Sequence, residues 1–203
     1  MARTIIHDDC LNWIKTQEVL QNVVTGICDQ SETTMNIDEY LVFFNDVADE
    51  IFKKLAPKGY AIFIQTDRKY NKQVLSKAFM LMTIAYEHNV KLIWHKIVMH
   101  RPGTDLHRPS YAHMLCFSKS GTTGAATPDV IQPSKRVYKN GTPINAAIVA
   151  LEFIKKYSDS NVVIDLFVGR ETIVAIANKM GLSAIGIDID KEQVEAATKL
   201  IIS

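Results

Sequence analysis

The sequence predicts an α/β protein built on a doubly wound, mostly parallel sheet of about seven strands. Strand-like and helix-like segments alternate along most of the chain, which is the pattern of a parallel sheet covered by helices on both faces. A βαβ unit closes the chain: an apolar strand, a turn at Gly169, a helix, and a second apolar strand that ends in Asp188. With 203 residues, 47% hydrophobic and 22% charged, the chain can bury a core without metals or disulfides.

Apolar runs and helical spacing assign the elements of the first half in order. Runs of apolar and β-branched residues predict strands over residues 4–7, 22–25, 60–66, 92–99 and 111–117. Helices are predicted over residues 10–16 and 72–87. A further helix begins at Asn36, which forms a capping pair with Glu39, and is stopped by Pro57 and Gly59.

The second half follows a segment rich in Gly, Thr and Pro, residues 121–133, which predicts a surface loop. A helix over residues 143–157 has Pro143 in its first turn, where proline is tolerated. The closing unit then contains strands over residues 162–167 and 184–189 and helices over residues 172–180 and 192–200.

Whole-chain properties limit the protein class. A net charge of +1 gives no polyanion-binding signature, so any nucleic-acid contact must depend on local charge. The three cysteines are widely spaced, no apolar run is long enough to cross a bilayer, and no signal-peptide pattern follows Met1. We therefore expect a reduced intracellular protein, cytoplasmic or nuclear, without a membrane partner.

The closing βαβ unit has the chemistry of a site for an adenosine-containing cofactor. Gly169 lets backbone approach a ligand, and Asp188, about 20 residues on, can accept hydrogen bonds from ribose hydroxyls. Gly169 is followed by Arg170, Glu171 and Thr172, so the glycine-rich cradle that binds a pyrophosphate is missing. The unit therefore favours a cofactor without phosphate.

The segments Asp165-x-Phe167-x-Gly169 and Gly186-Ile187-Asp188 resemble the S-adenosylmethionine site of class I methyltransferases. The chain as a whole is most similar to the permuted, beta-type amino-methyltransferases of nucleic acids, in which the cofactor half lies last. The resemblance implies one seven-stranded Rossmann-like methyltransferase domain over residues 1–203, with an antiparallel last pair of strands. Residues 1–119 would form the substrate and catalytic half, 120–139 a loop, and 140–203 the cofactor half.

The same resemblance implies a set of residues for S-adenosylmethionine. Ile5-Ile6-His7-Asp8-Asp9-Cys10-Leu11 is similar to the opening strand and its acid, and Asn140-Gly141-Thr142-Pro143 to a cofactor-contacting turn. The expected cofactor-binding residues are Asp9, Thr142, Asp165, Phe167, Gly169, Glu171 and Asp188. For Asp9 a second interpretation is the N-cap of the helix that follows, and Asp190 is expected to cap the last helix.

The predicted catalytic loop departs from the family pattern. Where the family has an acidic or amide residue, two prolines and an aromatic residue, this chain has Gly26-Ile27-Cys28-Asp29-Gln30. Asp29, with the backbone carbonyl of Gly26, is the candidate acceptor for the hydrogens of the target amine. Cys28 is a candidate thiolate nucleophile, with a small buried hydrophobe as its alternative role.

Cations between the middle strands predict a nucleic-acid contact. Five of the six histidines also lie between His88 and His113, but no pair has the helical spacing of a zinc motif, so we expect no metal. The expected phosphate contacts are Arg68, Lys69, Lys96, Arg101 and Arg108. A solvated basic face without a partner is the alternative.

The sequence therefore predicts an S-adenosylmethionine-dependent methyltransferase acting on an exocyclic amine of a nucleic acid. RNA is favoured over DNA because only residues 120–139 stand where DNA-modifying relatives insert a target-recognition domain. A protein partner could then supply substrate recognition. Two alternatives remain open: a catalytically inactive methyltransferase-like binding or scaffold subunit, and a pyrimidine C5-methyltransferase that uses Cys28.

Overall fold

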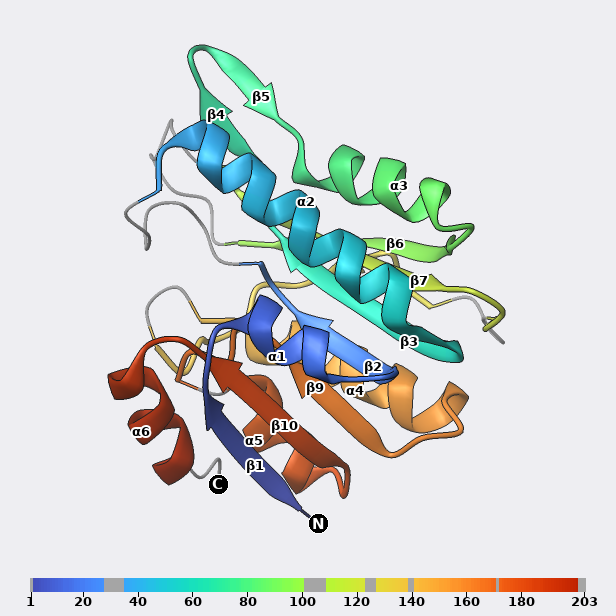
Figure 1. The fold of residues 1–203 in the computed structure, drawn as a ribbon, viewed down its shortest axis with the longest axis vertical. Helices are drawn as coiled ribbons and strands as arrows, with labels where there is room; N and C mark the ends of the chain where they lie inside the picture. The colour runs from blue at the N-terminus through green and yellow to red at the C-terminus, as the bar shows by residue number, and fades with distance from the viewer. Residues whose placement is uncertain are drawn as a thin grey trace.

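The computed structural model describes residues 2–27, 35–100, 109–122, 127–138, 141–170 and 172–200. Their main feature is one eight-stranded sheet in the order β1-β10-β9-β2-β3-β7-β6-β8 (Figure 1). The strands are β1 (Arg3–His7), β10 (Ser183–Asp188), β9 (Val162–Asp165), β2 (Leu20–Thr25), β3 (Leu55–Gln65), β7 (Tyr111–Ser118), β6 (Lys91–Met99) and β8 (Val130–Ile131). The doubly wound sheet predicted from the sequence is confirmed.

The direction of the strands also agrees with the prediction. The first five strands of the sheet order are parallel, and β7 is antiparallel to both of its neighbours, β3 and β6. The short edge strand β8, which pairs in parallel with β6, was not predicted. Its two residues, Val130 and Ile131, lie in the segment expected to be a loop, because so short an apolar pair carries no periodic signal.

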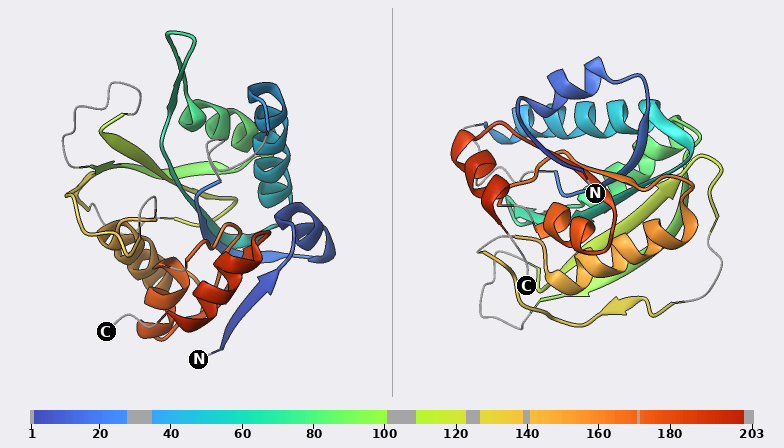
Figure 2. Two further views of the ribbon diagram at one scale, coloured as in Figure 1. Left: turned by 90° about the vertical axis from the view of Figure 1, so that its left-hand side faces the viewer. Right: turned by 90° about the horizontal axis from the view of Figure 1, so that it is seen from below.

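Helices cover both faces of the sheet (Figures 1 and 2). One face carries α1 (Cys10–Thr16), α2 (Ile37–Lys54) and α3 (Lys77–Glu87), and the other α4 (Ile144–Tyr157), α5 (Thr172–Lys179) and α6 (Lys191–Lys199). Each layer encloses its own hydrophobic core, with Phe44, Phe52 and Phe117 fully buried on the first face and Leu151 and Val174 on the second. None of the helices described is long and apolar enough to cross a membrane.

Local signals set the beginning of α2. Asn36 accepts hydrogen bonds from the backbone N–H groups of Asp38 and Glu39, both at 3.0 Å, and the Glu39 carboxylate accepts from Asn36 N at 3.0 Å. This reciprocal capping box satisfies helix-terminal donors, and such caps contribute about 1 kcal/mol. The predicted start of this helix is confirmed, and its last residue, Lys54, lies just before Pro57.

The region between β3 and α3 differs from the prediction of one long helix. A two-stranded hairpin, β4 (Arg68–Tyr70) and β5 (Gln73–Leu75), precedes α3, which begins only after its N-cap Ser76. The hairpin stands clear of the sheet and helices in the left panel of Figure 2. The helix expected over residues 72–87 therefore began too early, because Gln73-Val74-Leu75 fits a strand as well as a helix.

The strand order indicates where a ligand is expected to bind. From β9 the chain runs through α5 to β10 on one side, whereas β2 lies on the other side and leads through α2 to β3. Ligands of doubly wound sheets bind at the carboxyl ends of the strands where the order reverses in this way. The carboxyl ends of β9 and β2 therefore define the candidate site.

Candidate active site at the carboxyl ends of β9 and β2

Asp165, the last residue of β9, links this strand to β2. Its Oδ1 accepts hydrogen bonds from the Thr25 hydroxyl at the end of β2 (2.8 Å) and from Phe167 N (3.2 Å). Burial raises the pKa of Asp165 to about 7, although both hydrogen bonds lower it. The two hydrogen bonds hold the turn after β9 in place. Because of the raised pKa, the carboxyl group keeps its proton up to about pH 7.

Asp188, at the end of β10, holds the same turn from the other side. Its Oδ2 accepts from Gly169 N at 2.8 Å, and its Oδ1 accepts from Asp190 N at 2.9 Å. A carboxylate oxygen can accept more than one hydrogen bond, so Asp188 keeps acceptor capacity for a ligand. Asp190 caps α6 through Glu192 N, as predicted.

Two features require a glycine at position 169: a left-handed backbone and close contact with Tyr138, which the sequence did not indicate. Its φ of +52° is in the left-handed region, where a side chain is strained. A Cβ at this position would also collide with the hydroxyl of Tyr138. Tyr138 thus covers the turn that was expected to lie open to a ligand, and its role could not be seen because 31 residues separate it from Gly169.

Thr142 and Asp9 lie on two other turns near this edge. Thr142 is half-buried and follows Gly141, whose N–H donates to the carbonyl of Tyr138 at 3.1 Å, so the Thr142 turn adjoins the tyrosine over Gly169. Asp9 is the N-cap of α1 and accepts from Asn12 N at 3.0 Å. The capping interpretation of Asp9 is confirmed, and it does not exclude a contact through its other carboxylate oxygen.

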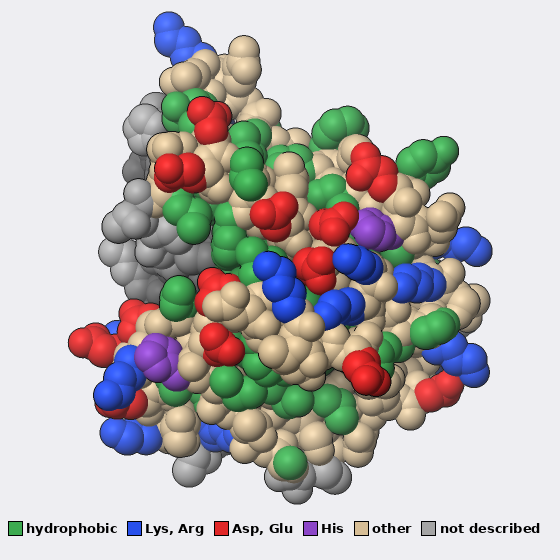
Figure 3. Space-filling model, in the orientation of Figure 1, with side chains coloured by type: hydrophobic (Ala, Val, Ile, Leu, Met, Phe, Trp, Pro, Cys, Tyr) green, Lys and Arg blue, Asp and Glu red, His purple; other side chains and the backbone are tan. Residues whose placement is uncertain are grey.

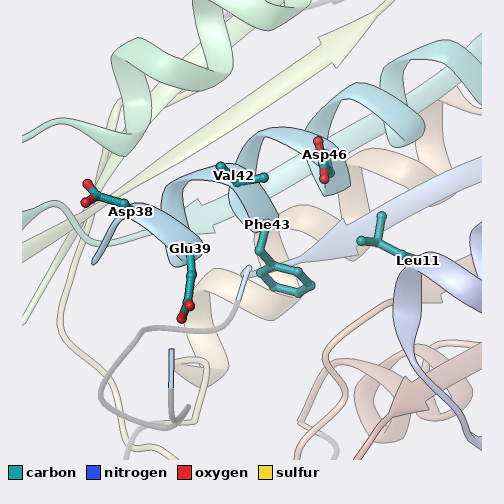
Figure 4. Close-up of a pocket in the computed structure, with 6 residues that line it drawn as sticks. All are labelled: Leu11, Asp38, Glu39, Val42, Phe43 and Asp46. Atoms are coloured by element: carbon teal, nitrogen blue, oxygen red, sulfur yellow. The ribbon is translucent and has the colours of Figure 1, made fainter. Parts of the chain in front are cut away.

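A pocket opens between α1 and α2 beside this edge, with a cavity volume of about 440 Å³. Its lining residues are Leu11, Asp38, Glu39, Val42, Phe43 and Asp46 (Figure 4). Phe43 meets the ring of Phe167 edge to face, at 6.0 Å between centroids. The pocket is therefore mainly apolar with carboxylates at its rim, and one ring contact joins it to the turn after β9.

The N-terminal part of the loop that the sequence predicts to be catalytic is held tightly. Gly26 packs so closely on β3 that a Cβ would lie 2.8 Å from the carbonyl oxygen of Ile64. The buried side chain of Gln65 donates from Nε2 to the carbonyl oxygen of Ile27 at 3.0 Å. These contacts fix the chain as it leaves β2. Cys28 and Asp29 lie outside the described residues, as does Glu171, which was predicted to contact the cofactor.

One further polar side chain lies near the turn after β9. Thr172 is the first residue of α5, is only 2% exposed, and its buried hydroxyl has no hydrogen-bond partner among the described residues. Burying a hydroxyl without a partner is costly. A ligand group at the N-terminus of α5 would supply one. The sequence analysis used Thr172 only to show that the turn after Gly169 is not rich in glycine. Its position at a helix N-terminus, where anions bind, was a signal that could have identified it.

A chain of three polar side chains connects the segment after β3 with β7 and β6. Asp67 accepts from Lys77 N at 2.9 Å through Oδ1, and its Oδ2 lies 3.1 Å from His113 Nε2. His113 Nδ1 in turn lies 2.9 Å from His95 Nε2. Burial would raise the pKa of Asp67, but its contacts with His113 and the α3 backbone keep it below the usual value. Burial and then His113 lower the pKa of His95.

These contacts relate the tautomers of the two histidines to each other. If Asp67 accepts from His113 Nε2–H and each ring carries a single N–H, His113 accepts at Nδ1 and His95 donates from Nε2. No group of three or more metal-ligating side chains occurs among the described residues. Two of the five histidines noted in the sequence, His95 and His113, thus form a hydrogen-bonded chain ending in Asp67, which was not expected from the sequence.

The structure places the residues predicted to contact phosphates in different environments. The prediction for Lys96 is wrong in this structure, because Lys96 is 3% exposed and its ammonium donates to Thr127 Oγ1 and Pro128 O, both at 2.7 Å. Its role is to hold the segment before β8. Arg68 and Lys69 lie on β4 of the projecting hairpin. Arg101 and Arg108 lie outside the described residues.

Comparisons with known proteins agree with this arrangement. The family model described as DNA methylase (N6/N4 methyltransferases) matches residues 13–199. A search of curated proteins finds no match. Among solved structures, PvuII DNA methyltransferase (cytosine-N4-specific) superposes with a TM-score of 0.76 at 16% identity, covering 98% of this chain and 86% of that chain.

Two other solved structures contain a cofactor. A candidate DNA modification methylase from Thermus thermophilus, complexed with S-adenosyl-L-methionine, has a TM-score of 0.74 at 17% identity, covering 97% of this chain and 91% of that chain. The M1.HpyAVI–SAM complex has a TM-score of 0.65 at 15% identity, covering 97% of this chain and 98% of that chain. At these identities the superpositions establish the shared fold.

Proposed function

This chain belongs to the N6/N4 DNA methylase family, and it is a methyltransferase whose methyl donor is S-adenosylmethionine; we propose that its acceptor is an exocyclic amine of a DNA base. The observation that carries the proposal is the crevice in which Asp165 bonds Thr25, and Asp188 bonds Gly169, at the carboxyl ends of β9, β2 and β10. Family membership favours DNA over the RNA expected from the short segment 120–139.

The residues present fit the cofactor. We assign the ribose hydroxyls to Asp188, and the carboxylate of the methionine part to the N-terminus of α5, where Thr172 has a buried hydroxyl without a partner among the described residues. Glu171 would pair with the ammonium group. The pocket floored by Leu11 and Phe43 is suited to the adenine ring, with Asp9 near its amine.

Phe167 and Thr142 support this assignment indirectly. Phe167 contacts Phe43 at the pocket wall and donates its backbone N–H to Asp165, so it holds the pocket and the turn in one arrangement. Thr142 adjoins Tyr138, which covers Gly169. Movement of Tyr138 away from Gly169 would open the turn to a ligand.

The chemistry needs an electrophilic methyl group, which S-adenosylmethionine supplies when bound, and a site that orients the target amine. The chain must align the nitrogen lone pair and accept hydrogen bonds from the amine. The carbonyl of Gly26 stands at the fixed start of the loop, and Asp29 is the side-chain acceptor that we propose. Gln65 would help to position the start of this loop, because it holds the carbonyl of Ile27.

The test uses tritiated S-adenosylmethionine with unmethylated genomic DNA and, separately, total cellular RNA. We expect label in DNA, its loss in Asp29→Ala, and its retention in Cys28→Ala, which is the matched control because it alters the adjacent residue of the same loop. Digestion to nucleosides should find the label on an amine of adenine or cytosine.

Other outcomes would replace the proposal. Loss in Cys28→Ala with label on carbon 5 of a pyrimidine would establish the thiolate route. Label in RNA alone would restore the RNA substrate. Cofactor binding by calorimetry without transfer to either nucleic acid would identify a scaffold subunit.

A further inference from the structure

The hairpin β4–β5 is an unusually basic projection from the substrate side of the molecule. Residues 68–75, RKYNKQVL, contain three cations and no acid, whereas the whole chain has a net charge of only +1. The hairpin follows closely after Gln65, the residue that ends β3 and holds the catalytic loop at Ile27. It is therefore rooted at the carboxyl edge where the target base must enter.

The shape of the hairpin is set by a strained turn with a lysine at its tip. Tyr70 pairs with Gln73, so Asn71 and Lys72 form a two-residue loop, and their φ angles are +48° and +62°. Such turns favour Asn and Gly, and a lysine in this left-handed conformation costs about 1 kcal/mol. The strain places an exposed cation at the end of the projection, where Figure 3 shows a Lys or Arg side chain at the top of the molecule.

One face of the hairpin is exposed, and none of the hairpin's own residues is acidic. Lys69 and Val74 are a cross-strand pair and thus share a face, and Val74 is 63% exposed. On the other face Tyr70 is 41% exposed and pairs with Gln73. By contrast, acidic side chains gather over the neighbouring α2 (Figure 3), including Asp38, Glu39 and Asp46 of the pocket. A polyanion is attracted to the hairpin and repelled from α2.

The dimensions decide which part of a polyanion fits. Two paired strands lie about 4.8 Å apart, and the major groove of B-DNA, about 12 Å wide, admits a two-stranded β-ribbon. Three residues per strand project about 10 Å, close to the depth of that groove of about 8.5 Å. An exposed valine can contact a thymine methyl group, and lysines at the rim can contact phosphates.

We propose that the hairpin β4–β5 inserts into the major groove of duplex DNA beside the target base, with Lys72 on a phosphate and Val74 facing base edges. This inference rests on the proposed function, because it takes DNA as the substrate. It gives the chain a duplex-contacting element outside the segment 120–139, and so accounts for recognition by a protein whose loop there is short.

The decisive variants are Lys72→Gly and its matched control, Asn71→Gly. Both place glycine at a left-handed position of the same turn and should leave the melting temperature unchanged or slightly raised, but only the first removes a charge. Val74→Glu adds a carboxylate on an exposed position of the proposed groove face. Binding to a mixed-sequence duplex and to its single strand is measured by fluorescence anisotropy over a range of salt concentrations.

We expect Lys72→Gly to lower the slope of log affinity against log salt on the duplex by about one unit, and Asn71→Gly to leave it unchanged. Val74→Glu should weaken duplex binding more than single-strand binding. If wild-type protein binds and methylates duplex DNA while Lys72→Gly and Val74→Glu behave like Asn71→Gly, this inference is overturned and the proposed function stands. Equal losses on both probes exclude groove insertion, and wild-type protein that neither binds nor methylates DNA overturns both proposals.

Discussion

Replacing Asp165 by asparagine should remove a large part of the pH dependence of stability between about pH 4 and pH 7. Burial raises the pKa of Asp165 to about 7 in the folded protein, against 3.8 for an ordinary aspartate. Between these values the unfolded chain has lost the proton that the folded chain still holds. The contribution of the Asp165 carboxyl group to stability is therefore fully present below pH 3.8, and it is lost as the pH rises through about 7.

The size of the effect follows from the shift. A difference of about 3 pKa units corresponds to about 4 kcal/mol, at about 1.4 kcal/mol per unit. Asparagine keeps a side-chain oxygen to accept from the Thr25 hydroxyl and Phe167 N, but it carries no charge at any pH. The amide of the variant should thus resemble the protonated wild-type carboxyl group.

Urea unfolding followed by circular dichroism from pH 4.5 to pH 8 measures the effect as the difference between wild type and Asp165→Asn. That difference should grow with pH in favour of the variant. Asp159→Asn, at an exposed aspartate paired with Lys58, is the control and should parallel the wild type. A constant difference between Asp165→Asn and wild type across this range would refute the argument that the buried carboxyl holds its proton.

Three further changes test the candidate site. Gly169→Ala should destabilise the fold by about 1–3 kcal/mol, because the backbone of residue 169 is left-handed and the new Cβ would collide with Tyr138. Adding Tyr138→Ala should recover only the part of the loss that is due to the collision. Thermal unfolding measures both variants, and no loss of stability in Gly169→Ala would contradict this geometry. Gln65→Ala should lower the free energy of unfolding by about 1–3 kcal/mol, because it leaves the buried carbonyl of Ile27 without its donor. The same variant should lower the rate of methyl transfer more than the affinity for the cofactor. Equal effects on both would argue against a role of Gln65 in positioning the loop. Asp188→Ala should weaken S-adenosylmethionine binding by about 1.5–3 kcal/mol in calorimetry, and unchanged affinity in folded protein would remove Asp188 from the site.

The sequence determined those features whose causes lie close together in the chain. The capping box of Asn36 and Glu39 predicted the start of α2, because its donors and acceptors are three residues apart. The βαβ unit from Val162 to Asp188 was recognisable because its strands are short apolar runs and its helix has helical spacing. Gly169 marks the turn after the first strand, and Asp188 marks the end of the second. The fold class followed from these local signals, and so did the prediction of a cofactor half.

Tertiary structure alone decided which distant residues meet. Lys96 has the sequence context of an exposed strand cation, yet it is buried by a segment about 30 residues further on. Asp67 and His113 are 46 residues apart and come together only because β3 pairs with β7. Tyr138 covers Gly169 for a similar reason, since packing of the turn before α4 places its ring there. Side-chain burial and partners depend on strand order and packing between elements, which no short window of sequence specifies.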